Sequence, residues 1–81
     1  MLTAYIHAAM HHEHYELLPD NEGFYGEVED LPGVWAQAPT LELCREELQS
    51  VLEGWLLLGL RLGHSLPIID AIDLNVQQEV V

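Results

Sequence analysis

Three histidines near the N-terminus have the types and spacing that could bind a metal ion. His7, His11 and His14 recur at intervals of four and three residues, so a helix would place their side chains on one face. The HExxH motif of zinc proteases is not present in this stretch. The alternative is a polar helix face that binds no ion. We adopt this alternative and expect neither a metal nor another cofactor.

Glu27, Glu29 and Asp30 form a second group that could do chemistry. Clustered carboxylates hold paired metal ions in nucleases of the RNase H type. Glu27 and Glu29 would share one face of a strand, but no further acids on suitable elements complete such a site. The sequence also has no phosphate-binding glycine loop and no nucleophile motif. We therefore interpret the acids as a solvated strand face and predict that the protein is not an enzyme.

Aromatic side chains lie beside these acids in the sequence. Phe24 and Tyr25 precede them, and Trp35 follows the next turn. Alternation along paired strands would place some aromatics on the sheet face away from a covering helix, where aromatics beside acids are typical of binding hot spots. Because Val34 and Ala36 are better core candidates, we assign Trp35 to an interface and Phe24 to core packing.

The chain is strongly acidic. Fourteen acids against two arginines and no lysine give a formal net charge of −12. Such a surface repels phosphate groups, so we expect no direct binding to nucleic acid. It would attract a basic partner protein and speed their encounter. The alternative is that the acidity serves solubility alone.

Length and composition indicate one small globular domain over residues 1–81, with an apolar content of 49%. The longest unbroken apolar run, Trp55–Leu58, is far shorter than the roughly 20 residues that span a bilayer. No signal peptide is recognisable at the N-terminus. The single cysteine, Cys44, is interpreted as a small buried residue, and a cytoplasmic location is expected.

A long helix over Leu41–Leu62 must position much of the molecule. Thr40 is a good N-cap, Glu42 suits the positive end of the helix dipole, Arg61 suits the negative end, and Gly63 can end the helix with positive φ. Helical periodicity predicts one core-facing stripe, formed by Leu41, Cys44, Leu48, Val51, Leu52, Trp55, Leu58, Gly59 and Leu62.

The end of this helix is apolar on all sides. Leu56, Leu57 and Leu60 fall outside the predicted stripe and need a second cover. A chain of this size has little left to supply one, and small domains often gain stability by association. We therefore predict at least a homodimer through these three leucines. The alternative is that the C-terminal tail folds over them.

Sheet-forming patterns precede the long helix. The expected strands are Tyr15–Leu18, Phe24–Glu29 and Val34–Ala38. Turn residues join them into an antiparallel meander, and the long helix must cover one face of it. An additional N-terminal helix within residues 1–14, ending near His12, is expected before the sheet. The tail, residues 64–81, contains a possible edge strand over Ile68–Ile72, and residues 75–81 are expected to fray.

Three motifs in order resemble the HicB antitoxin family. They read GFYGEV at residues 23–28, LPGVWA at residues 31–36 and TLELC at residues 40–44. The family has an aromatic-rich strand, a turn containing Leu-Pro-Gly, a hydrophobic strand, and a Thr-Leu-Glu helix start. Leu43 stands where the family usually has an acid. The resemblance covers about Tyr15–Leu62, and it also includes Leu66, Pro67 and the possible closing strand.

The resemblance implies an α+β fold with the order αβββα, often described as a partial RNase H-like fold. It also implies a binding module that masks a small basic HicA-type toxin, an RNA-cleaving protein. Many members carry a C-terminal DNA-binding domain, which has no counterpart up to Val81. Candidate contacts with the toxin are Tyr25, Glu27, Glu29, Asp30 and Trp35. The alternative is a homo-oligomeric protein of the same fold with no toxin partner.

Overall fold

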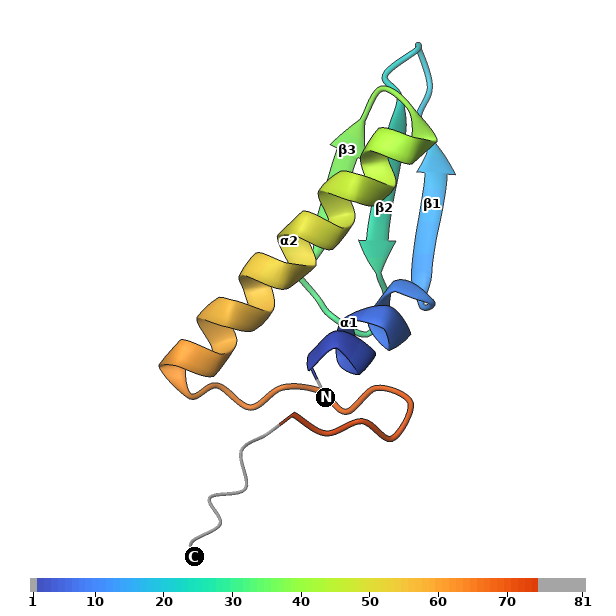
Figure 1. Cartoon of the computed structure of the whole chain (residues 1–81). Helices are drawn as coiled ribbons and strands as arrows, with labels where there is room; N and C mark the ends of the chain where they lie inside the picture. Colours follow the sequence, from blue (N-terminus) through green and yellow to red (C-terminus); the bar gives the residue numbers. More distant parts are fainter. Residues whose placement is uncertain (1, 75–81) are drawn as a thin grey trace, which may run out of the picture.

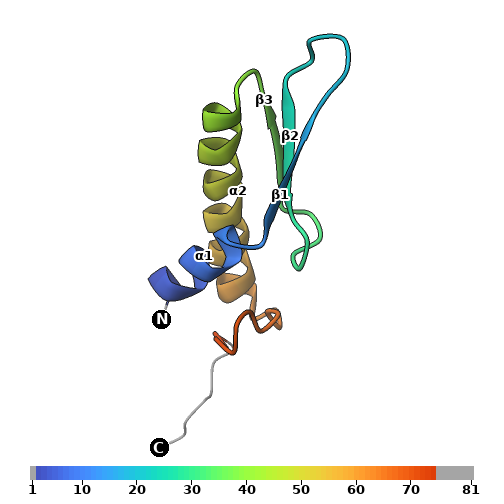
Figure 2. The ribbon, with the colours of Figure 1, turned by 90° about the vertical axis from the view of Figure 1, so that its right-hand side faces the viewer.

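Three antiparallel strands lie in sequence between a short helix and a long one (Figure 1). The computed structural model describes residues 2–74. The elements are α1 (Leu2–Met10), β1 (Glu13–Leu17), β2 (Phe24–Val28), β3 (Trp35–Ala38) and α2 (Leu41–Leu62). The sheet has the order β1-β2-β3, and α2 covers one face of it, as Figure 2 shows edge-on. The predicted α+β fold with the order αβββα is confirmed.

Strand register decides which side chains face α2. Tyr15 lies opposite Gly26, and Gly26 lies opposite Ala36. Ala36 is buried and Tyr15 is half-buried, so this row faces the helix. A Cβ atom at Gly26 would lie 2.6 Å from the Tyr15 ring and 3.1 Å from the Sγ atom of Cys44. Only glycine therefore fits between the Tyr15 ring and α2.

The ends of α2 are fixed by the residues that the sequence indicated. The Thr40 Oγ1 atom accepts a hydrogen bond of 3.1 Å from the backbone N–H of Leu43. At the other end, Gly63 has a φ of 72°, and its N–H donates to the carbonyls of Gly59 and Leu60. Both predicted bounds of the long helix are confirmed because each depends on local backbone chemistry.

The buried side of α2 winds around the helix. Cys44, Leu48, Leu52 and Leu56 are all buried, and each follows the previous one by four residues. Four residues turn an α-helix by about 400°, so each step moves the buried row by about 40°. Figure 1 shows why: the first half of α2 lies against the sheet, and its second half extends past the sheet toward α1 and residues 64–74.

This winding corrects the straight stripe predicted from periodicity. Leu41, Leu58 and Leu62 were placed in the core, but all three are exposed. Leu56 was placed on an oligomer surface, but it is 1% exposed and packs in the core. For Leu56, Leu58 and Leu62, a stripe extrapolated from the sheet-facing half of the helix misses the change of packing partner in the second half.

The N-terminal elements also differ from prediction at their boundary. The helix ends at Met10, and β1 begins at Glu13, two residues before the predicted strand start at Tyr15. Tyr5, Ala9 and Met10 are buried in the core, so α1 contributes packing as well as a polar surface. The chain needs only two residues to turn from α1 into β1.

Residues 64–74 form no strand of the sheet within the described part of the chain. The expected edge strand over Ile68–Ile72 is instead a tight turn, closed by backbone hydrogen bonds of 3.2 and 2.7 Å between Ile69 and Ile72. Asp70 and Ala71 at its tip have positive φ. Leu66 and Ile69 are buried, so the segment packs on the helices rather than beside a strand. The expected fraying of residues 75–81 lies outside the described residues.

The winding row predicts which leucines of α2 carry stability. Leu52 is 0% exposed, so Leu52→Ala should leave a cavity and lower the free energy of unfolding by about 2–5 kcal/mol. Exposed Leu43 provides the matched control, since Leu43→Ala should change the free energy of unfolding by less than about 0.5 kcal/mol. Urea unfolding followed by circular dichroism measures both, and equal losses would contradict the assignment.

Candidate protein-binding face

Within the part of the chain that the structure describes, one face of the sheet has no helix over it (Figure 2). The register places His14, Glu27 and Trp35 in one row across the three strands. The neighbouring row holds Glu16, Tyr25 and Gln37. We call these six residues the outward sheet face. All six are exposed or half-buried, so the face is accessible to another protein.

The centre of the outward sheet face is an aromatic pair beside a carboxylate. The rings of Tyr25 and Trp35 stack with centroids 6.0 Å apart and an angle of 26° between their planes. The Tyr25 hydroxyl donates a 3.1 Å hydrogen bond to Oε1 of Glu27. Partial desolvation and this hydrogen bond raise the pKa of Tyr25 above 10.0. Trp35 remains 52% exposed, which leaves a large aromatic surface available for contact.

The remaining two predicted contact residues lie beyond this face. β2 ends at Val28, so Glu29 and Asp30 belong to the following turn. The expectation that Glu29 shares a strand face with Glu27 is therefore wrong. The Asp30 carboxylate lies 3.0 Å from Nδ1 of His12. Glu27, Glu29 and Asp30 are thus distributed over two surfaces and do not converge as the carboxylates of a two-metal nuclease would.

The three candidate metal-binding histidines do not share one element, since His7 is in α1, His11 follows α1, and His14 is in β1. His7 and His11 lie near each other, with ring centroids 4.7 Å apart. His14 belongs to β1 and to the outward sheet face, so the predicted common helix face is wrong. Among residues 2–74, no group of three or more His, Cys, Asp or Glu side chains is arranged to hold a metal ion.

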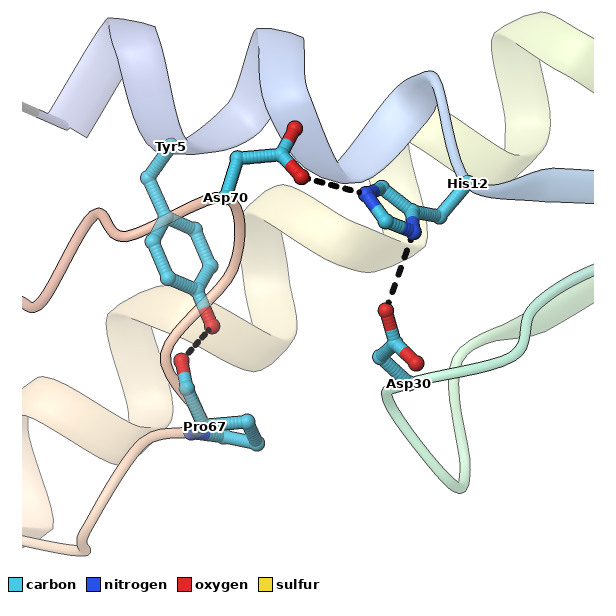
Figure 3. Close-up of polar contacts among 5 residues, drawn as sticks. All are labelled: Tyr5, His12, Asp30, Pro67 and Asp70. Carbon is cyan, nitrogen blue, oxygen red and sulfur yellow. Dashed lines mark hydrogen bonds and ion pairs between the residues drawn. The ribbon is translucent and has the colours of Figure 1, made fainter.

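A different histidine connects three distant segments of the chain. His12, at the junction of α1 and β1, lies with Nδ1 3.0 Å from Asp30 and Nε2 3.0 Å from Asp70 (Figure 3). Nearby, the Tyr5 hydroxyl donates a 2.6 Å hydrogen bond to the carbonyl of Pro67. These contacts fasten residues 64–74 to α1 and to the turn between β2 and β3. Sequence analysis missed them because 58 residues separate His12 from Asp70 and no local pattern joins them.

Comparisons with known proteins agree with this fold. The family model described as UPF0150-like matches residues 4–67. The crystal structure of TTHA0281 from Thermus thermophilus is similar with a TM-score of 0.87 and 42% identity, over 94% of each chain. No curated protein matches this chain. The chain therefore belongs to the UPF0150-like family.

Within residues 2–74, no helix has both the length and the apolar character needed to cross a membrane.

The His12 junction predicts a pH-dependent stability. Hydrogen bonding to Asp70, with the charges of Asp70, Asp30 and Glu29, raises the pKa of His12 above 6.5. A histidine whose pKa is higher in the folded state than in the unfolded state stabilises the fold fully at pH values below its unfolded-state pKa. This stabilisation is lost as the pH rises through its folded-state pKa. His12→Gln should therefore destabilise more at about pH 5.5 than at about pH 8.

Urea unfolding of wild type and variant at the two pH values measures this difference. His64→Gln is the control, because His64 is exposed beyond α2 and makes no contact with Asp30 or Asp70. An equal loss of stability at both pH values would contradict a role for the imidazolium form.

Proposed function

We propose that this chain is a HicB-like antitoxin-type binding module. It neutralises a small basic HicA-type RNA-cleaving toxin by covering the toxin's active site, and it acts in the cytoplasm without catalysing a reaction. The observation that carries the proposal is the outward sheet face, where the stacked Tyr25 and Trp35 rings lie beside Glu27. An exposed aromatic anchor flanked by acids suits a basic protein surface.

Charge and sequence motifs support the same proposal. A net charge of −12 steers a cationic partner toward the chain and disfavours direct contact with RNA or DNA. The motifs at residues 23–28, 31–36 and 40–44 resemble those of HicB antitoxins. In the structure these stretches include β2, the first half of β3 and the start of α2, and these elements build and support the outward sheet face. The motifs therefore form one connected part of the molecule.

Within this proposal, the contact residues have different roles. Tyr25 and Trp35 supply apolar area at the centre, and Glu27 and Glu16 supply charge around them. Asp30 and Glu29 lie at the end of β2, where they extend the acidic surface toward the His12 junction. Removing an aromatic should mainly speed dissociation, while removing a peripheral acid should mainly slow association.

The second candidate function is a homo-oligomeric protein of this family with no toxin partner. Its supporting observation is the pair of leucines Leu57 and Leu60, which remain exposed on α2 at 58% and 38%. Residues 64–74 pack near this end of the molecule but leave these two side chains uncovered. A chain that forms oligomers and ignores basic proteins encoded beside it would favour this second function.

Co-expression with any small basic protein whose gene adjoins the gene of this chain tests the proposal. We expect a stable heteromeric peak in size-exclusion chromatography with light scattering, weakened by salt because charge pairs are screened. Trp35→Ala should weaken the complex by at least about tenfold, the effect of losing an aromatic hot spot. Failure to form any complex with the adjacent protein would contradict the toxin assignment.

A charge reversal on the outward sheet face provides the matched comparison. Glu27→Lys should weaken the complex. Glu46→Lys makes the same change of charge at an exposed position of α2, and this helix lies on the other side of the sheet from the outward sheet face. Net charge is equal in the two variants, so a difference between them reports position alone. If the two variants weakened the complex equally, the partner would bind at another surface or be attracted only nonspecifically.

A further inference from the structure

A stretch that contains no acids begins in the second half of α2, although the chain is strongly acidic. No Asp or Glu occurs between Glu53 and Asp70, although the chain has fourteen acids. Within this stretch, Leu57 and Leu58 are exposed by 58% and 57%. Two copies of a chain with a net charge of −12 repel one another over most of their surface. This stretch is where they can approach with the least repulsion between carboxylates.

The exposed side of α2 has a regular order. Glu47, Gly54 and Arg61 are seven residues apart, which is about two helical turns, so they lie in one line along the helix. Ser50, Leu57 and Leu58 flank this line at helical spacing. We call these six residues the outer stripe of α2. All six are exposed.

We propose that the outer stripe is a homodimer interface in which two α2 helices cross antiparallel at Gly54. Seven residues separate Gly54 from Glu47 on one side and from Arg61 on the other. A twofold axis at Gly54 therefore brings Arg61 of each copy opposite Glu47 of the second copy. It also sets Leu58 opposite the small Ser50 side chain of the second copy.

Each residue of the outer stripe has a defined part in this pairing. Gly54 has open space beside it, since a Cβ atom there would meet nothing within 4 Å, so two backbones can approach closely at the crossing. Leu57 and Leu58 supply the apolar area. Among the described residues Arg61 forms no ion pair, and Glu47 forms none either. The dimer gives each of these charges an opposite partner.

Such a dimer is compatible with the proposed function but does not depend on it. α2 lies on one side of the sheet, and the outward sheet face lies on the other (Figure 2). Joining two copies through α2 therefore leaves both outward sheet faces free. A helix crossing of this length buries less area than the roughly 1,200–2,000 Å² of standard interfaces, so association is expected to be reversible and concentration-dependent.

Sedimentation of the chain alone over a range of concentrations tests the pairing and needs no partner protein. Glu47→Arg places like charges opposite one another and should weaken the dimer at least about tenfold, although it lowers the net negative charge. Arg61→Glu should also weaken it. The double variant exchanges the two charges and should restore dimerisation to within about threefold of wild type. A double variant no better than either single variant would overturn the antiparallel pairing.

Leucine substitutions give a second, independent measurement. Leu58→Asp should abolish the dimer, whereas Leu43→Asp adds the same charge at another exposed leucine of α2 and should leave it intact. Circular dichroism of each variant verifies that the monomer remains folded. A wild-type chain that stays monomeric at every concentration, or a dimer unaffected by Leu58→Asp, would overturn the proposal whatever the outcome of toxin binding.

Discussion

The buried row on α2 is the constraint on which the rest of the structure depends. Cys44 and Leu48 cover the sheet, and Leu52 and Leu56 continue the same row toward α1 and residues 64–74. One helix thus closes two packing layers, because its buried side turns by about 40° at each step. A small domain buries a limited share of its surface, so one helix that packs in two layers supplies core residues to both. The exposed positions of α2 follow from this arrangement.

The two proposed interaction surfaces lie on opposite sides of the molecule and differ in chemistry. The outward sheet face joins aromatic rings to carboxylates, which suits a basic protein. The outer stripe of α2 contains two exposed leucines and one of the two arginines of the chain. Under the two proposals, negative charge disfavours a second copy at the outward sheet face and apolar side chains favour one at the outer stripe, so the surfaces would bind different partners.

Sequence reasoning succeeded where structure depends on neighbouring residues. The bounds of α2 were predicted because Thr40 and Gly63 act on adjacent backbone groups. The exposure of Trp35 beside buried Ala36 was predicted because strand alternation is a local rule. Sequence reasoning failed where distant segments meet. Leu56 is buried in the half of α2 that residues 64–74 approach, and His12 contacts Asp30 and Asp70, which are far from it in the sequence. No local periodicity contains that information.

The central claim is that the outward sheet face binds a basic protein, and Trp35 reports directly on it. The chain has two tryptophans, so Trp55→Phe leaves Trp35 as the sole indole. Titrating this variant with a small basic protein whose gene adjoins that of this chain should shift Trp35 fluorescence to shorter wavelength, because the 52% exposed ring becomes desolvated. A complex that forms with no change in Trp35 emission would show that binding occurs elsewhere and would contradict the account.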